Sequence, residues 1–165
     1  MVQGAPRVIV IVPCFEEARF LGAVLATMPP LVDEILVVDD GSGDETAEVA
    51  RRASLQDPRI SVLVHAANRG VGAAIISGYL EALARGGAAT DALVVMAGDG
   101  QMAPGDLAAV AGPVLRGEAD YVKGDRFRHG SRREMPRGRY LGGRVFSALT
   151  GWAVGAPISD SQCGF

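Results

Sequence analysis

Short apolar runs alternate with stretches of helical periodicity through most of the first 123 residues. Runs of three to five consecutive apolar residues, bounded by Pro, Gly or Asp, are typical of strands that are buried on both faces. Between these runs, apolar residues recur every three or four positions, as they do on one face of a helix. The runs predict strands over residues 8–12, 35–38 and 92–96, and the mainly apolar stretches 60–64 and 121–123 predict two more.

The periodic stretches predict four helices, each with a recognisable boundary. The first covers residues 16–28 and stops at Pro29-Pro30, and the second begins at a capping box formed by Ser42 and Glu45. The third follows the Gly-rich turn 68–72 and runs to about residue 85, and the fourth covers 104–115. On the third helix we expect the core-facing residues to be Ile75, Ile76, Tyr79, Leu80 and Leu83.

This alternation of strands and helices predicts an α/β fold, a mostly parallel sheet with helices on both faces. A chain of 165 residues is large enough for one domain with a real core, and we assign residues 1–165 to a single domain. After Gly124 the pattern changes to an Arg-rich stretch with little periodicity. One amphipathic helix is then predicted, ending near Gly151 and carrying Tyr140, Leu141, Val145, Phe146 and Leu149.

Charge and cysteine content narrow the classes of function. The net charge of −3 does not favour a nucleic-acid-binding protein. Eight of the 16 Lys and Arg residues lie between Lys123 and Arg144, which suggests an anionic partner at one place or, equally, a solvated loop. The two cysteines, Cys14 and Cys163, show no metal-ligand spacing, and a reducing compartment fits them. No apolar run approaches the roughly 18–20 residues of a membrane helix.

Asp99 and Gln101 follow the fourth predicted strand directly and form the leading candidate site. The carboxyl end of a buried parallel strand is where open α/β sheets bind ligands. Two oxygen donors, two residues apart, suit a magnesium ion that takes its other ligands from water and substrate phosphates. Taken alone, however, an Asp in a turn explains Asp99 better than a metal ligand does.

Other polar segments follow predicted strands, and each also has a structural explanation. The segment 39–42 carries two adjacent carboxylates, which either bind a base or ribose or cap a turn. The turn 68–72 presents backbone N–H groups to a phosphate or allows close helix packing. Arg126 either pairs with a phosphate or forms a surface ion pair. Asp160 either takes a proton on the acceptor side or caps a turn.

Six motifs in this order resemble the family-two inverting glycosyltransferases, and most closely their dolichol-phosphate mannosyltransferase and polyprenyl-phosphate glycosyltransferase branch. The resemblance covers nearly the whole chain. The motifs are Val-Pro-Cys-Phe-Glu-Glu at 12–17, Val-Val-Asp-Asp-Gly-Ser at 37–42, Asn-Arg-Gly-Val-Gly-Ala-Ala at 68–74, Met-Ala-Gly-Asp-Gly-Gln at 96–101, Lys-Gly-Asp-Arg-Phe at 123–127 and Asp-Ser-Gln-Cys-Gly-Phe at 160–165.

The resemblance implies a glycosyltransferase A-type fold and transfer of a sugar, with inversion, from a UDP- or GDP-sugar to a polyprenyl phosphate. It implies Mg²⁺ or Mn²⁺ at Asp99 and Gln101, and Asp99 and Asp160 as catalytic residues. The Arg-rich segment 123–144 would face a lipid phosphate or the membrane surface, at its cytoplasmic side. The implied nucleotide-sugar contacts are Pro13, Phe15, Glu17, Val38, Asp40, Gly98, Asp99, Gln101 and Arg126.

The chain departs from the family pattern at two places. Ala97 stands where the family has an Asp two residues before Asp99, which removes one metal or ribose contact. The last motif continues with Arg in the family, whereas this chain ends at Phe165, and we therefore expect a domain truncated at its C-terminus.

Two rival interpretations follow from the same residues. The departures suggest a catalytically impaired nucleotide-sugar-binding module within a larger membrane-associated protein. A nucleotidyltransferase ranks last, because the segment after the first predicted strand is acidic, with Glu16 and Glu17, rather than basic. The base, the sugar and the acceptor stay open at this point.

Overall fold

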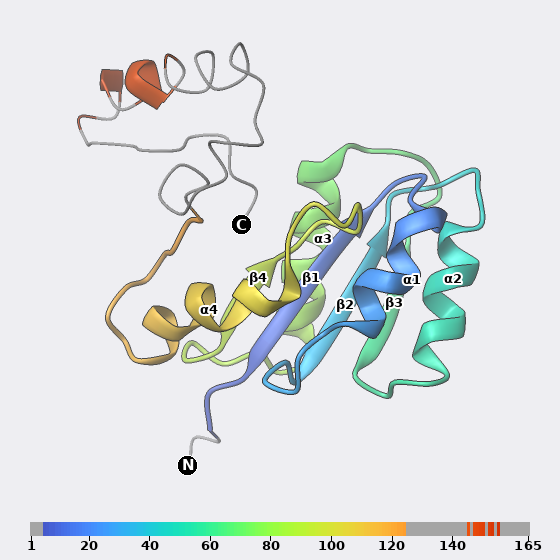
Figure 1. Ribbon diagram of the computed structural model, residues 1–165, viewed down its shortest axis with the longest axis horizontal. Coiled ribbons are helices and arrows are strands. Elements are labelled where there is room, and N and C mark those ends of the chain that lie inside the picture. Colours follow the sequence, from blue (N-terminus) through green and yellow to red (C-terminus); the bar gives the residue numbers. More distant parts are fainter. Residues whose placement is uncertain (1–4, 125–144, 146, 151, 154, 156–165) are drawn as a thin grey trace. The chain divides into compact units, whose positions relative to one another are not determined.

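The computed structural model describes residues 5–124, 145, 147–150, 152, 153 and 155 of the chain (Figure 1). The chain forms two compact units, Met1–Val122 and Lys123–Phe165. The single catalytic domain assigned to residues 1–165 stays a prediction. In chain order the elements are β1 (Val8–Cys14), α1 (Ala18–Ala26), β2 (Glu34–Asp39), α2 (Thr46–Ser54), β3 (Ile60–Val64), α3 (Val71–Ala84), β4 (Ala92–Val95), the 3₁₀ turn η1 (Pro104–Asp106) and α4 (Leu107–Leu115).

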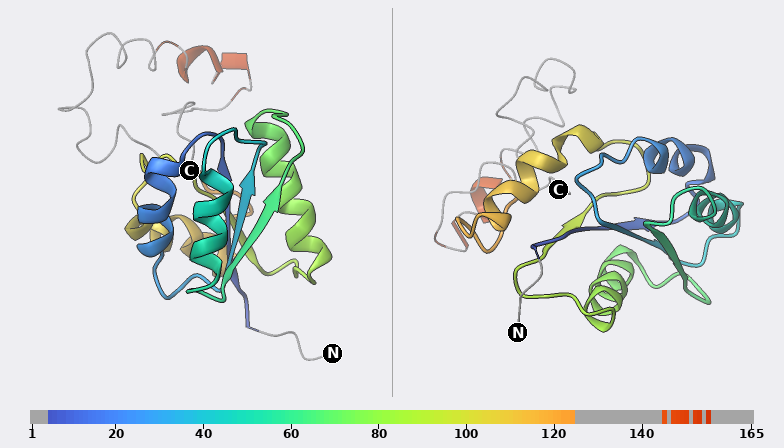
Figure 2. Two further views of the ribbon diagram at one scale, coloured as in Figure 1. Left: turned by 90° about the vertical axis from the view of Figure 1, so that its right-hand side faces the viewer. Right: turned by 90° about the horizontal axis from the view of Figure 1, so that it is seen from below.

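The four strands form one parallel sheet in the order β3-β2-β1-β4. Every residue of β1 is buried, as expected for a strand with neighbours on both sides and helices on both faces. Helices α1, α2 and α4 cover one face of the sheet and α3 covers the other (Figure 2, right). The predicted parallel sheet with helices on both faces is confirmed.

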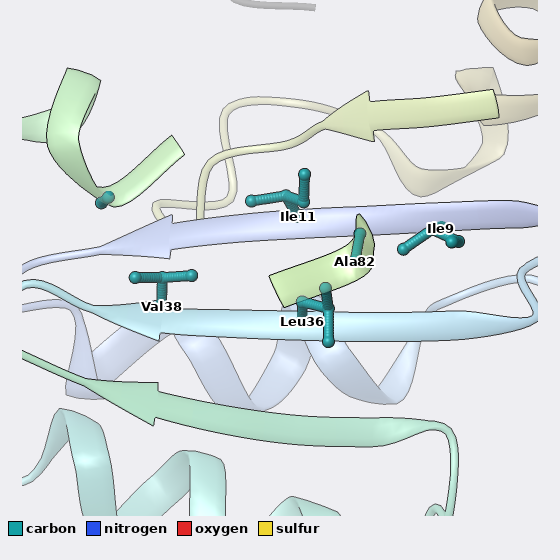
Figure 3. Close-up of a cluster of buried hydrophobic side chains, with 6 residues drawn as sticks. Ile9, Ile11, Leu36, Val38 and Ala82 are labelled. Carbon is teal, nitrogen blue, oxygen red and sulfur yellow. The ribbon is translucent and has the colours of Figure 1, made fainter. Parts of the chain in front are cut away.

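The core under α3 is formed by alternate residues of the two central strands. Ile9 and Ile11 of β1 point to the same side as Leu36 and Val38 of β2 (Figure 3). Burying each of these side chains contributes about 1.5–3 kcal/mol. Because this cluster belongs to the two central strands, it holds their carboxyl ends in a fixed register.

Helix α3 turns mainly its small residues toward the sheet, and of its large residues Tyr79 packs against the core cluster. Its buried residues are Ala74, Gly78 and Ala82. The prediction that Ile76, Leu80 and Leu83 face the core is wrong, because their exposures are 59%, 61% and 58%; Ile75 and Tyr79 are partly buried. The physical reason is the close approach of the helix to β1, where a Cβ added at Gly78 would overlap the side chain of Ile11.

Two predicted strand limits also need correction. β1 continues through Pro13, which the sequence predicts as its end. The carbonyl of Pro13 accepts a hydrogen bond from the Gly98 N–H on the β4 side. The N–H that proline lacks would face the same side, where the pairing of β1 with β4 already ends at Val95. Proline at this position therefore costs the sheet no hydrogen bond. Residues 121–123 form no strand in the described chain, and Tyr121 is exposed, because no neighbouring strand pairs with them there.

The second unit contains the predicted C-terminal helix in part. The backbone is helical at residues 145, 147–150, 152 and 153, which extends past the predicted end near residue 151. Tyr140, Leu141 and Phe146, which the prediction also placed on this helix, lie outside the described residues.

Replacing Gly78 with Ala tests the close packing of α3 on β1. We expect Gly78→Ala to destabilise the fold by about 1–2 kcal/mol, because overpacking exceeds the gain in helix propensity. Gly72→Ala, in the first turn of the same helix with no atom within 4 Å of the added Cβ, is the matched control and retains full stability. Urea denaturation measures both variants, and equal midpoints would contradict the packing argument.

Candidate functional site

The carboxyl ends of the parallel strands and the loops that follow them meet at one edge of the sheet. The chain adds β2 and β3 on one side of β1 and then β4 on the other. In open α/β sheets, ligands bind outside the strand ends at such a switch point. The loops after β1 and β4 carry Glu17, Gly98 and Asp99, so the predicted metal and phosphate residues lie beside this point.

Asp40 is the most completely hydrogen-bonded carboxylate at this edge. Its residue is only 2% exposed. It accepts hydrogen bonds from the backbone N–H groups of Arg69, at 3.0 and 3.1 Å, and of Gly70, at 2.7 Å. Burial alone would raise the pKa of Asp40, but His65 and these two N–H groups lower it below its ordinary value. Asp40 therefore stays ionised and holds the 68–70 turn in place.

His65 completes this network, and the sequence gave it no predicted role. Its Nδ1 lies 2.6 Å from the Asp40 carboxylate and its Nε2 lies 2.9 Å from the hydroxyl of Ser77 on α3. In a neutral ring, Nδ1–H donates to Asp40 and Nε2 accepts the Ser77 hydroxyl proton. The only signal in the sequence was the position of His65 directly after a strand.

The loop after β2 also caps helix α1. The Glu16 N–H donates to the Ser42 hydroxyl and the Glu17 N–H to the Thr46 hydroxyl, both at 2.9 Å. The Ala18 N–H donates to the Asp44 carboxylate at 3.3 Å. The N–H groups at the start of a helix have no partner within the helix, so these acceptors satisfy them from the loop after β2 and from the first residue of α2.

The predicted capping box of Ser42 and Glu45 is therefore wrong. Glu45 precedes α2 without any side-chain capping bond. The Ser42 hydroxyl donates to Asp39 and accepts from Glu16, so it is already used between the two loops. The Asp44 carboxylate instead accepts from Thr46, and this hydrogen bond lowers the pKa of Asp44.

Glu17 reaches across from α1 to the loop after β4. Its Oε2 is buried and has no hydrogen-bond partner among the described residues. A Cβ added at Gly98 would overlap that oxygen, so the glycine makes room for the carboxylate. Burial first, and then the charges of Asp99 and Asp44, raise the pKa of Glu17 to about 7. The negative charges of Glu17 and Asp99 are therefore poorly compensated between the ends of β1 and β4.

Asp99 and Gln101 lie in a tight turn beside Glu17. The Asp99 Oδ1 accepts the Gln101 N–H at 2.9 Å, and Gly100 between them has a φ of +74° that favours glycine. No hydrogen bond occupies the second Asp99 oxygen within the part of the chain that the structure describes. The Gln101 side chain is exposed.

These residues fit a metal site completed by a bound substrate, and not one whose ligands all come from the protein. In the described residues, no three His, Cys, Asp or Glu side chains gather closely enough to hold a metal. Carboxylate and amide oxygens are the donors that Mg²⁺ and Mn²⁺ prefer. A cation at Asp99 and Gln101 would therefore need further ligands from water and a substrate phosphate.

The remaining predicted contacts occupy different environments. Pro13 and Val38 are buried and face each other in the β1–β2 register, and Val38 belongs to the core under α3. Phe15 is 41% exposed, so its ring is available at the edge of the site. Arg126 and Asp160 lie outside the described residues.

Comparison with known proteins gives a family match over most of the chain. Residues 9–147 match the profile described as Glycosyl transferase family 2. The chain is 29% identical over 168 residues to the UDP-N-acetylglucosamine–dolichyl-phosphate N-acetylglucosaminyltransferase of Methanococcus voltae, covering 93% of this chain and 66% of that protein. It is 32% identical over 168 residues to the polyprenol monophosphomannose synthase of Mycolicibacterium smegmatis, covering 99% and 62% respectively. The chain thus spans slightly less than two thirds of the length of these relatives.

The fold has relatives among solved structures. Glucosyl-3-phosphoglycerate synthase from Mycobacterium tuberculosis matches with a TM-score of 0.50 at 23% identity, over 68% of this chain and 42% of that chain. The architecture is that of a glycosyltransferase A-type fold, as the resemblance of the motifs implied. In the described part of the chain, no helix combines the length and apolar character needed to cross a membrane.

Glu17→Gln tests the uncompensated charge between β1 and β4. The folded-state pKa of about 7 lies above the ordinary 4.5, so the native chain loses stability as pH rises from about 4.5 to about 7. We expect the variant, in EDTA, to equal the native chain at pH 4 and to exceed it at pH 8 by about 1 kcal/mol, since solvent screens this partly exposed group.

Glu16→Gln is the matched control, because Glu16 is adjacent and exposed. Thermal unfolding at pH 4, 6 and 8 measures all three chains. A difference between Glu17→Gln and the native chain that does not vary with pH would contradict the electrostatic argument.

His65→Ala tests the network around Asp40. The substitution leaves the buried Asp40 and the partly buried Ser77 without one partner each, and we expect a loss of about 2–3 kcal/mol in stability. His65→Asn, whose amide can still donate toward Asp40, should recover part of this loss. Hydrogen exchange at the Arg69 and Gly70 amides should accelerate in the Ala variant, and unchanged protection there would show that His65 does not hold the turn.

Proposed function

Since this chain belongs to glycosyl transferase family 2, we propose that it transfers a sugar, with inversion, from a nucleotide-sugar donor to a polyprenyl phosphate. The observation that carries the proposal is the uncompensated pair of carboxylates, Glu17 and Asp99, at the β1–β4 switch point. Such a pair favours a cation, and the diphosphate of a nucleotide-sugar is the ligand that a cation there would hold.

The names of two relatives support the proposed acceptor class. One is named for transfer of N-acetylglucosamine to dolichyl phosphate and the other for synthesis of polyprenol monophosphomannose. Their sugars differ while their acceptors share a polyprenyl phosphate. We therefore propose only the acceptor class, and the base and the sugar of the donor stay open.

Different residues of the site would hold different parts of the donor. Asp99 and Gln101 would hold Mg²⁺ or Mn²⁺, which supplies positive charge to the departing diphosphate when bound. The 41% exposed ring of Phe15 offers a face for the nucleobase. Asp40, fixed by His65 and the 68–70 turn, shapes the nucleoside end of the site.

The transfer itself requires one bond to form and one to break. An oxygen of the acceptor phosphate attacks the anomeric carbon from the face opposite the diphosphate, and the bond from that carbon to the diphosphate breaks. The electron pair leaves with the nucleoside diphosphate, and the sugar configuration inverts. Because the acceptor phosphate is already anionic at neutral pH, the reaction needs no strong base, and a catalytic role for Asp160 stays a prediction.

A second candidate is a nucleotide-sugar-binding module with impaired catalysis. Ala97 favours it, because the family carries Asp at this place and the described residues contain no group of three acidic, His or Cys metal ligands. The two candidates predict the same donor binding. They differ in whether labelled sugar appears on polyprenyl phosphate when the chain, its donor and Mn²⁺ are mixed.

Asp99→Asn tests the metal-dependent binding of the donor diphosphate. We expect GDP or UDP to bind the native chain at least tenfold more tightly with Mn²⁺ than with EDTA, and the variant to lose that difference. Asp106→Asn, at an exposed Asp in the turn before α4, is the control and should keep it. Isothermal titration calorimetry measures each Kd, and metal-independent binding by the native chain would count against Asp99 as a ligand.

A further inference from the structure

The backbone around Glu17 fixes the point from which its side chain leaves α1. Glu16, the residue before it, has a φ of +55°, in the left-handed region that residues other than glycine seldom adopt. The hydroxyls of Ser42 and Thr46 accept the N–H groups of Glu16 and Glu17 and hold this turn. The Glu17 carbonyl accepts two N–H groups of α1, so the helix begins from the same residue.

Gly98, in the loop after β4, leaves room for the Glu17 carboxylate. A Cβ at position 98 would overlap the Glu17 Oε2, and it would lie 3.2 Å from both the Cys14 Cβ and the Leu21 Cδ1. The Oε2 is buried here and accepts no hydrogen bond among the described residues. Because a buried carboxylate oxygen is costly without a partner, it is placed where a bound positive group would satisfy it.

The turn that carries Asp99 and Gln101 begins directly after Gly98, so the Glu17 carboxylate lies next to it. Position 97, on the other side of Gly98, is an alanine and has no side-chain oxygen. The turn alone therefore offers a cation one carboxylate and one amide. Magnesium is commonly bound through one or two carboxylates together with substrate phosphates, and Glu17 brings a second carboxylate from a different element.

Asp39 provides an internal comparison. Its Oδ2 is also a buried side-chain oxygen without a partner in the described chain. However, its Oδ1 accepts both the N–H and the hydroxyl of Ser42, and β2 lies on the other side of β1 from β4. Asp39 is thus already bonded and lies away from the turn that carries Asp99, whereas Glu17 lies beside that turn.

We propose that Glu17 is a third protein ligand, with Asp99 and Gln101, of the cation that holds the donor diphosphate. This inference rests on the proposed function, because it concerns the cation of that site. The cation would join the start of α1 to the turn after β4 and would supply the positive charge that the buried Glu17 oxygen lacks. The set contains only two carboxylates, which agrees with the absence of a three-residue acidic, His or Cys cluster in the described chain.

Mn²⁺ alone, without nucleotide, tests this inference. Electron paramagnetic resonance measures free Mn²⁺ while the metal is titrated into the native chain, Glu17→Gln and Glu16→Gln. We expect weak but measurable binding by the native chain and a loss of about tenfold or more in affinity for Glu17→Gln. Glu16→Gln removes the same charge from the adjacent, exposed residue and should bind like the native chain, which excludes a long-range electrostatic effect.

Gly98→Ala moves the Glu17 carboxylate without changing any charge. Because the added Cβ would overlap the Oε2, we expect Mn²⁺ affinity to fall about tenfold here as well. Gly105→Ala, with no atom within 4 Å of the added Cβ, is the matched control and should retain the native affinity. Urea denaturation verifies that both variants fold, and Glu17→Gln carries the test if Gly98→Ala does not.

Native affinity for Mn²⁺ in Glu17→Gln, or in a folded Gly98→Ala, would overturn the proposal. Absence of Mn²⁺ binding by the native chain, together with a lower stability of Glu17→Gln at pH 8, would also overturn it and indicate that a basic side chain of the protein compensates Glu17.

The transfer assay separates this inference from the proposed function. Sugar transfer by the native chain, with unchanged Mn²⁺ affinity in Glu17→Gln, would contradict the ligand role of Glu17 alone. Binding of Mn²⁺ that requires Glu17, without any transfer of labelled sugar to polyprenyl phosphate, would contradict the proposed function and leave the cation site in place.

Discussion

A buried carboxylate needs hydrogen-bond donors, and the ligand-facing edge of this protein is built around how Asp40 obtains them. The donors come from the Arg69 and Gly70 backbone and from His65, which Ser77 in turn holds. These bonds join the end of β2 to the end of β3 and to α3. Asp39, one residue earlier, accepts from Ser42, which joins the loops after β1 and β2. Removing the charge of Asp40 would therefore loosen several loops together.

One strand away from Asp40, a carboxylate with a buried oxygen lacks such hydrogen-bond donors in the described chain. Between β1 and β4, Glu17 has a buried oxygen without a partner, and its pKa is raised by burial and by the charge of Asp99. The edge thus combines a fully hydrogen-bonded carboxylate at Asp40 with a buried Glu17 oxygen that has no partner among the described residues. Under the proposed function, the first arrangement would make the nucleoside end rigid, and the second would favour a cation with a diphosphate.

Ala97 stands where the resemblance of the motifs implies a carboxylate, so the proposed cation site would rest on fewer protein groups. Asp99 retains one oxygen that accepts no hydrogen bond within the described chain, and Gln101 adds an exposed amide. With so few protein ligands, a cation at the proposed site would depend on the phosphates of the donor for its affinity. Donor and metal binding would then be strongly coupled, unlike binding at a closed structural metal site.

Local sequence alone determined four of the five predicted strands, the helices and the family, because apolar period and turn chemistry act between residues close in the chain. It also correctly placed Asp99 and Gln101 in the turn after β4. Only the tertiary structure decided which face of α3 meets the sheet, because Gly78 must approach Ile11, 67 positions away in the numbering. It also decided that Ser42 joins two loops instead of capping a helix, and that His65 pairs with Asp40 across 25 residues. These outcomes depend on which groups are buried together. The partners of a buried carboxylate are the groups close to it in space, and a local sequence pattern does not encode that proximity.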